Sequence, residues 1–155
     1  VPRTFMSVWA VVVAAGKGER SGLEQNKVFF SWRGETVLGR SLDALESSGA
    51  LDGIVLVISE SDRDLYERMV RREGTHPLVK QIAFGGETRR DSVYNGLRAL
   101  PEDAEIVAVH DAARPFVTAE IVRATVESAR EYGSGVIATP VTDTIKQIHP
   151  DGSIM

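Results

Sequence analysis

Short apolar runs alternate with amphipathic segments along this chain. The runs are rich in β-branched residues and predict buried strands at Val8–Val13, Ile54–Ile58, Val79–Phe84, Ile106–Val109 and Gly135–Thr139. Between each pair of runs, apolar residues recur at helical spacing, as at Leu38, Leu42 and Leu45; Leu65, Met69 and Val70; Val93, Leu97 and Leu100; and Val122, Val126 and Ala129. Strands are therefore predicted to alternate with helices.

This alternation predicts the fold class. Continuous apolar strands separated by amphipathic helices are typical of a parallel sheet that is covered on both faces. We therefore predict an α/β three-layer sandwich with a mostly parallel, Rossmann-like sheet, forming a single domain over residues 1–155. Two helix starts carry the capping-box spacing, at Ser61 with Asp64 and at Thr88 with Asp91.

The pattern changes after Pro140. Asp143–Ile148 alternates like an exposed strand, and the following His149-Pro150-Asp151-Gly152 is typical of a turn, with only three residues left after it for a second strand. A lone strand leaves its backbone groups unpaired. We expect residues 141–155 to be the start of a β-arm that continues in a longer protein or pairs with another chain. At the other end, Met6 directly precedes the first strand, and our hypothesis is that it is the natural start.

Composition and charge exclude several classes of partner. The 18 basic and 22 acidic residues are interspersed and give a net charge of −4, so no basic face is expected to bind nucleic acid. The longest apolar run, Val8–Ala15, is far shorter than the roughly 20 residues of a membrane span. The absence of cysteine excludes disulfides and cysteine metal sites and agrees with a cytoplasmic location. The three histidines are too scattered for a histidine-rich metal site.

A glycine loop, Ala14-Ala15-Gly16-Lys17-Gly18-Glu19-Arg20-Ser21-Gly22, follows the first strand, where open α/β sheets bind ligands. Glycines let backbone amides approach a phosphate, and Arg20 adds a cationic fork. The loop lacks the third glycine of the dinucleotide motif, where Ser21 stands, and the closing Gly-Lys-Ser or Gly-Lys-Thr of the Walker motif. We predict anion binding by a different kind of loop, with a simple strand-to-helix turn as the alternative.

Lys27 lies shortly after this loop and before the apolar Val28-Phe29-Phe30. A single lysine is usually a solvated surface charge. Arg20 and Lys27 flank the same loop, however, and can meet one polyphosphate from two sides, which offsets the charge that develops during phosphoryl transfer.

A glycine-rich segment, GGETRRDSV, follows the third strand. A turn with a capped helix explains most of it, but not Arg89 and Arg90, because cations in a first helical turn oppose the helix dipole. These two arginines indicate an anion nearby.

The fourth strand is followed by VHDAARP. Asp111 at the strand end could hold Mg²⁺ between phosphates, and Arg114 could bind another anionic group. Equally, Asp111 could pair with Arg114 or cap the next turn. Thr142-Asp143-Thr144 has the same two interpretations, as a ligand contact or as ordinary strand polarity.

Taken together, AAGKGERSG with Lys27, GGETRRDSV, VHDAARP and PVTDTIK resemble the methylerythritol phosphate cytidylyltransferases of the non-mevalonate isoprenoid pathway. The resemblance covers nearly all of the chain from Val8. It implies a nucleotidyltransferase fold, Mg²⁺ as cofactor, and transfer of CMP from CTP to 2-C-methyl-D-erythritol 4-phosphate with release of pyrophosphate. Ribitol phosphate cytidylyltransferases share the motifs and are the main alternative. There are two further alternatives: a non-catalytic nucleotide-binding domain of the same fold, and a transferase that uses another nucleotide.

The resemblance also implies roles for individual residues. Arg20 and Lys27 would stabilise the transition state at the α-phosphate, and Asp111 would help to hold Mg²⁺. Residues that line the substrate pocket would be Ala14, Ala15, Gly16 and Gly18 at the triphosphate and nucleoside, Gly85, Gly86, Glu87, Ser92 and Ala112 at cytosine or ribose, and Arg114 and Thr144 towards the polyol phosphate.

The resemblance further implies a homodimer in which the two subunits exchange their β-arms. Thr144 of each arm would then contact the polyol phosphate in the site of the neighbouring subunit. Members of this family continue well past Met155. We therefore expect this chain to retain most of the CTP pocket, and its activity without the remainder of the protein is an open question.

Overall fold

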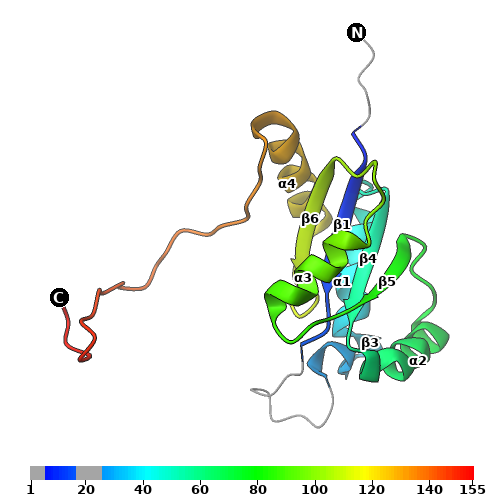
Figure 1. Ribbon diagram of the computed structural model, residues 1–155, viewed down its shortest axis with the longest axis horizontal. Helices are drawn as coiled ribbons and strands as arrows, with labels where there is room; N and C mark the ends of the chain where they lie inside the picture. Colours follow the sequence, from blue (N-terminus) through cyan, green and yellow to red (C-terminus); the bar gives the residue numbers. More distant parts are fainter. Residues whose placement is uncertain (1–5, 17–25) are drawn as a thin grey trace.

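A four-stranded parallel sheet forms the centre of the molecule. The computed structural model describes residues 6–16 and 26–155. The strands are β1 (Val8–Val13), β4 (Gly53–Ile58), β5 (Val79–Phe84) and β6 (Ile106–Asp111). Their order is β5-β4-β1-β6, and all neighbours are parallel (Figure 1). The first four predicted strands and their parallel arrangement are thus confirmed.

Helices cover both faces of this sheet. They are α1 (Val37–Ser47), α2 (Arg63–Glu73), α3 (Arg89–Arg98) and α4 (Ala119–Tyr132). The main core, on one face, combines the buried side chains of β1 and β4 with those of α1, α2 and α4: Val8, Ala10, Val12, Leu38, Leu42, Leu45, Ile54, Leu56, Ile58, Met69, Val122 and Val126. The three-layer sandwich is confirmed, since α3 lies on the opposite face (Figure 1).

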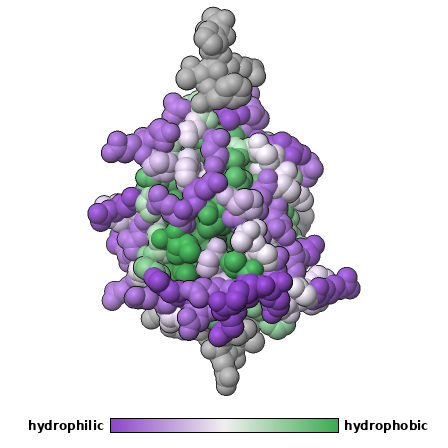
Figure 2. Space-filling view, turned by 90° about the vertical axis from the view of Figure 1, so that its right-hand side faces the viewer, coloured by the Kyte–Doolittle hydropathy of each residue, from purple (hydrophilic) through white to green (hydrophobic). Residues whose placement is uncertain are grey.

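The α3 face is closely packed at one point. A Cβ on Gly96 of α3 would lie 2.4 Å from Val11 Cγ1 and 2.8 Å from Val57 Cγ2. Only a glycine lets the helix backbone come this near to β1 and β4. Figure 2 looks onto the side where β5 and α2 lie, and shows apolar surface among hydrophilic side chains there. The edge strand β5 exposes Ile82 on the molecular surface.

A small antiparallel hairpin precedes α1 and was not predicted. A single 3-10 turn, η2 (Lys27–Phe29), leads into β2 (Ser31–Trp32) and β3 (Glu35–Thr36). Arg33 and Gly34 form its turn with φ of 56° and 91°, the left-handed pair that tight hairpins use. Strands of two residues carry no detectable alternation, so the hydrophobic pattern missed them.

One of the two predicted capping boxes is confirmed. The N–H of Asp91 donates to Thr88 Oγ1 at 3.1 Å, and Asp91 Oδ2 accepts from the N–H of Thr88 at 3.2 Å. The capping box predicted at Ser61 is wrong. A 3-10 turn, η3 (Glu60–Asp62), precedes α2, and Asp62 is the N-cap of that helix. The Ser61 hydroxyl instead pairs with that of Ser59 at 2.8 Å.

The C-terminal segment leaves the body of the molecule after Gly133, which ends α4 in the left-handed conformation (Figure 1). The predicted strand Gly135–Thr139 is wrong, because this apolar run pairs with no strand of residues 6–16 and 26–155 and Val136 is exposed. The predicted turn is confirmed by hydrogen bonds from Gly152 N to His149 O (2.9 Å) and from His149 N to Ser153 O (2.8 Å). The exposed strand expected at Asp143–Ile148 is reduced to one bridge, Ile148 with Ile154.

In the part of the chain that the structure describes, no helix has the length and apolar character required to cross a bilayer.

Candidate active site

The carboxyl ends of the parallel strands bring three of the four predicted segments to one edge of the sheet. Val13 lies opposite Val57 and Asp111 in the ladders. The next residues continue these ladders, with hydrogen bonds from Ala14 N to Val57 O (2.7 Å) and from Ala112 N to Val13 O (3.0 Å). The N–H of Gly85 donates to Ile58 O at 2.9 Å in the same way. The segments that follow β1, β5 and β6 therefore meet, as the sequence predicts.

The glycine loop itself is described only at its start. Gly16 has open space around it, since a Cβ there would have no heavy atom within 4 Å. Gly18 and Arg20 lie outside the described residues, so their predicted roles at the triphosphate stay predictions.

Asn26 closes the far end of this loop, and sequence reasoning missed it. Its buried side chain donates from Nδ2 to Ala14 O at 2.7 Å and to Asp62 Oδ2 at 2.9 Å, and Oδ1 accepts from Val28 N at 3.3 Å. Asn26 thus ties the two ends of the glycine loop together and connects them to the start of α2. No sequence pattern distinguishes Asn26 from other polar residues, because its partners are distant along the chain.

Lys27 directly follows this anchor. The buried Val28 and Phe29 fix η2 against the core, while Lys27 itself is exposed. Lys27 lines a cavity of about 410 Å³ together with Phe30, Trp32, Glu35, Thr36, Val37, Arg40, Ala113, Pro115 and Phe116. The structure therefore places Lys27 beside the segment that follows Asp111, although sequence spacing alone gave no reason to pair them.

Close backbone packing explains the two glycines after β5. A Cβ on Gly85 would lie 2.3 Å from Ala15 Cβ and 2.9 Å from Ser92 Oγ, and one on Gly86 would lie 2.5 Å from Asp91 Cβ. A side chain at Gly85 would force the loops after β1 and β5 apart, and one at Gly86 would collide with the first turn of α3. Glycine at position 85 is thus required for the approach of the two loops.

Polar groups of Ser92 and Ala112 already have hydrogen-bond partners within the protein. The buried Ser92 hydroxyl donates to Thr88 O at 3.0 Å and accepts from Gly86 N at 3.1 Å. Ala112 is fully buried, and its carbonyl accepts from Ser41 Oγ at 2.9 Å. Both residues shape the loops, and their predicted contacts with the nucleoside stay predictions. Glu87 is exposed at the same edge.

Asp111 lies between two arginines. Arg89 donates from Nε to Asp111 Oδ1 at 2.9 Å, and Arg114 Nε lies 3.3 Å from Oδ2. The predicted pairing of Asp111 with Arg114 is confirmed, and Arg89 is an additional partner. The sequence predicted an anion near Arg89, and in this structure that anion is the Asp111 carboxylate.

The donor set at Asp111 fits one coordination position of Mg²⁺. This ion usually takes one or two carboxylates and completes its shell with substrate phosphates and water. The Asp111 side chain is 28% exposed at the strand end, and a carboxylate has about four lone-pair positions. Two nitrogens of Arg89 approach Oδ1 and one nitrogen of Arg114 approaches Oδ2, so a position remains on Oδ2. No second carboxylate was predicted to join it.

His110 precedes Asp111 on β6. Burial lowers the pKa of His110 below its ordinary value, against the opposing effect of the Asp111 charge. Its Nε2 is buried and has no hydrogen-bond partner among the residues described. His110 is therefore neutral at pH 7 and adds no positive charge beside Asp111.

Thr144 is not brought to this edge by its own chain. It is exposed in the C-terminal segment that leads away from the sheet (Figure 1). Its predicted contact with the acceptor therefore depends on the arm of another subunit and stays a prediction.

Comparisons with known proteins agree with this geometry. The family model IspD, 2-C-methyl-D-erythritol 4-phosphate cytidylyltransferase, matches residues 8–155. The 2-C-methyl-D-erythritol 4-phosphate cytidylyltransferase of Pelotomaculum thermopropionicum is 42% identical over 149 residues, which cover 96% of this chain and 62% of that protein. The bifunctional enzyme IspD/IspF of Desulforudis audaxviator is 45% identical over 145 residues, covering 93% and 36%.

A solved structure gives the same result. The 4-diphosphocytidyl-2C-methyl-D-erythritol synthase of Anaerococcus prevotii superposes with a TM-score of 0.82 at 29% identity, covering 97% of this chain and 62% of that one. The chain thus spans less than two thirds of the length of these relatives. The matched family model and the converging strand-end segments show that the chain belongs to the 2-C-methyl-D-erythritol 4-phosphate cytidylyltransferase family.

Proposed function

We propose that the protein carrying this chain transfers CMP from CTP to 2-C-methyl-D-erythritol 4-phosphate and releases pyrophosphate. One observation carries the proposal: the segments after β1, β5 and β6 meet at the carboxyl edge of the sheet, with Lys27 beside the β6 segment. The family model and the names of the relatives favour methylerythritol phosphate over ribitol phosphate as acceptor.

The reaction needs positioning and charge neutralisation more than acid or base catalysis. A phosphate monoester is largely ionised at neutral pH, since its second pKa is about 6. Its oxygen can therefore attack the α-phosphorus of CTP in line, forming the new P–O bond while the bond to the β-phosphate bridging oxygen breaks. The electron pair leaves with pyrophosphate. The main barrier is repulsion between polyanions, which Lys27 and Arg20 offset by their charges.

Asp111 is the proposed Mg²⁺ ligand. The ion, when bound, supplies positive charge between the phosphates. Arg89 and Arg114 orient the carboxylate towards the strand edge. Arg114 is largely exposed, so it can turn from Asp111 to the acceptor phosphate when that group arrives.

The nucleoside is proposed to lie between the loops after β1 and β5. Ala14, Ala15 and Gly16 present small side chains on one side, and Gly85 and Gly86 on the other. The contact of Gly85 with Ala15 keeps these loops close, which suits a small pyrimidine base.

We also infer that the arm, residues 141–155, mediates a homodimer. It exposes Val141, Ile145, Ile148 and Ile154 and has a single bridge of its own. Apolar side chains on a segment with unpaired backbone groups favour pairing with a second copy.

Pyrophosphate release tests the proposal. The assay combines CTP, Mg²⁺ and 2-C-methyl-D-erythritol 4-phosphate with this chain and with a version extended to the length of the relatives. The extended protein is expected to turn over, and its Lys27→Ala variant to lose at least about 100-fold in rate, as for removal of a single charge-stabilising donor. Turnover with ribitol phosphate but not with methylerythritol phosphate would overturn the acceptor assignment, and unchanged turnover in the variant would remove Lys27 from the mechanism.

A further inference from the structure

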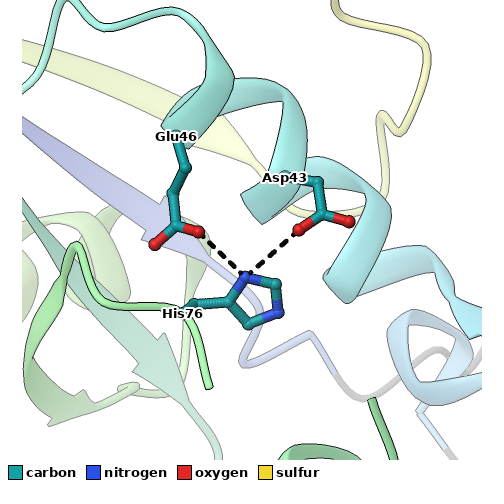
Figure 3. Close-up of side chains that lie close together, drawn as sticks. All are labelled: Asp43, Glu46 and His76. Atoms are coloured by element: carbon teal, nitrogen blue, oxygen red, sulfur yellow. Dashed lines mark hydrogen bonds and ion pairs between the residues drawn. The ribbon is translucent and has the colours of Figure 1, made fainter. Parts of the chain in front are cut away.

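A histidine and two carboxylates meet on α1, away from the edge that carries the proposed active site. Asp43 and Glu46 lie one turn apart on α1, and His76 comes from the connection between α2 and β5 (Figure 3). Within residues 6–16 and 26–155, this is the one group of three potential metal ligands whose ligand atoms all lie within 4.8 Å of one another. His76 precedes β5, so the cluster lies towards the amino ends of the strands.

Hydrogen bonding alone does not explain this arrangement. His76 Nδ1 lies 3.3 Å from Glu46 Oε2 and 3.4 Å from Asp43 Oδ1. The contact with Glu46 is a long hydrogen bond, beyond the usual N–H···O range of about 2.7–3.2 Å, and the contact with Asp43 is an ion-pair contact only. Nδ1 also carries at most one proton, so at least one of the two carboxylates faces it without a donor between them.

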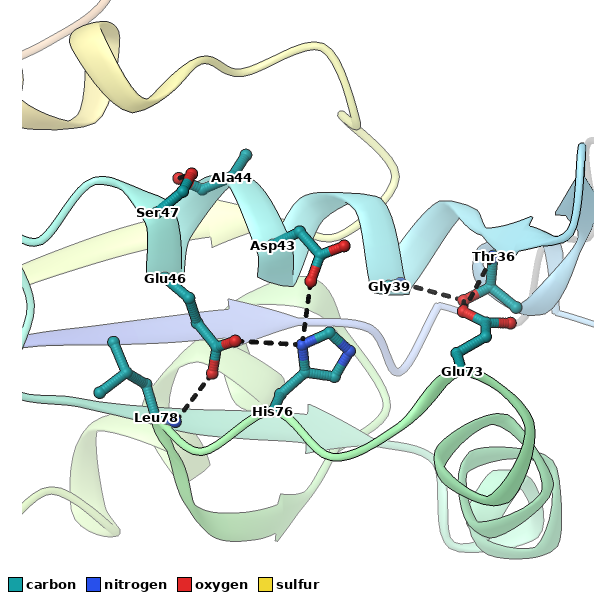
Figure 4. A network of polar contacts seen from close by, with 9 residues as sticks. All are labelled: Thr36, Gly39, Asp43, Ala44, Glu46, Ser47, Glu73, His76 and Leu78. Atoms are coloured by element: carbon teal, nitrogen blue, oxygen red, sulfur yellow. Dashed lines mark hydrogen bonds and ion pairs between the residues drawn. The ribbon is translucent and has the colours of Figure 1, made fainter.

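The ligand atoms are held in place by the fold. The His76 side chain is only 7% exposed, and its Nε2 is buried without a hydrogen-bond partner in the described part of the chain. Glu46 accepts from Leu78 N through Oε1 at 2.7 Å, which leaves Oε2 turned towards the imidazole (Figure 4). Asp43 is 60% exposed and provides access from solvent.

We propose that Asp43, Glu46 and His76 bind a divalent transition-metal ion of the zinc class, with water as the fourth ligand. Metal–ligand distances of about 2.0–2.1 Å in a tetrahedron place the ligand atoms about 3.3–3.4 Å apart. This is the spacing that separates His76 Nδ1 from both carboxylate oxygens. Two carboxylates and a neutral imidazole balance a double positive charge, and the nitrogen ligand selects against Mg²⁺.

The consequence of binding is structural. The ion would join α1 to the connection that leads into β5, two segments that are far apart in the chain. Because the ligands are not preformed in the unfolded chain, binding stabilises the native state.

Metal titration of the chelator-treated protein tests this proposal without any measurement of turnover. Cobalt chloride is expected to give the visible absorption bands of a four-coordinate site at one equivalent per chain. Zinc chloride is expected to displace the cobalt and to raise the melting temperature by several degrees, and an excess of magnesium chloride is expected to do neither. Absence of a saturable cobalt spectrum would overturn the proposal.

Variants separate this site from adventitious binding. His76→Gln is expected to abolish the cobalt bands, and Asp43→Asn, at an exposed position that the fold tolerates, to weaken binding at least tenfold. The matched controls are His149→Gln and Asp103→Asn, at exposed positions outside the cluster, which should bind as the parent does. Equal affinity in the Asp43→Asn variant and the parent would contradict the assignment.

Discussion

The Arg89 guanidinium donates from Nε to Asp111 Oδ1 at 2.9 Å and so joins the start of α3 to the end of β6. The strand order places β4 and β1 between β5, which leads into α3, and β6. The ion pair therefore spans the edge where the proposed nucleotide site lies. It holds the loop after β5 and the proposed Mg²⁺ ligand in a fixed relation.

Replacing Arg89 should reduce activity more than stability. We expect Arg89→Ala to lower kcat/KM for pyrophosphate release by about tenfold or more in the extended protein, because Asp111 loses the nearer of the two arginines that orient it. The Arg89 side chain is largely exposed, so the free energy of unfolding should change by less than about 1 kcal/mol. Arg90→Ala is the matched control, since Arg90 is more exposed and its ion pair within the described residues is with Asp91, at 3.7 Å, and not with Asp111. Equal losses in both variants would show that Arg89 acts only through general surface charge.

Asn26 is expected to matter for stability and for the position of Lys27. Asn26→Ala removes donors from Ala14 O and Asp62 Oδ2, which are buried with it. The free energy of unfolding should fall by about 1 to 3 kcal/mol in chemical denaturation, the usual cost of a buried unsatisfied group. Gln81→Ala on the exposed edge strand should change it by less than about 0.5 kcal/mol. A variant at Asn26 that is as stable as this control would contradict the anchoring role.

Local sequence pattern predicted the four strands of the sheet, the four helices and the capping box at Thr88, because each depends on spacing within a few residues. The pattern failed where a distant partner decides the outcome. Asn26 donates a hydrogen bond to Asp62, which is 36 residues away along the chain. Arg89 pairs with Asp111, which is 22 residues away. Val136 belongs to an apolar run that pairs with no strand among the described residues.

Substitution of Gly85 tests whether the loops after β1 and β5 must lie close together to bind the nucleotide. A Gly85→Ala side chain would meet Ala15 Cβ at 2.3 Å, so the loop after β5 must move away from β1. We expect this variant to weaken CTP binding at least tenfold in calorimetric titration. Adding Ala15→Gly removes the closest atom and should recover part of the affinity, although Ser92 Oγ still lies 2.9 Å from the new methyl group. No recovery in the double variant would show that the contact with Ala15 is not the cause.

Glu73 should make stability depend on pH. Burial alone would raise the pKa of this carboxyl, but hydrogen bonds from Arg72 and from the N–H and hydroxyl of Thr36 lower it below its ordinary value. A lowered pKa in the folded state means that the ionised form stabilises the protein above the unfolded pKa of about 4.3. That contribution is lost as the pH falls through the lower folded value.

Glu73→Gln is therefore expected to cost about 1 to 3 kcal/mol at pH 7, and this difference from the parent should shrink as the pH falls below about 4. Chemical denaturation of both proteins at several pH values between 3 and 7 measures it. Glu67→Gln is the matched control on the same helix, because Glu67 is exposed and forms an exposed ion pair with Arg71 at 3.6 Å. A difference for Glu73→Gln that stayed constant down to pH 3 would mean that the loss comes from packing around Thr36 and not from the charge of the carboxylate.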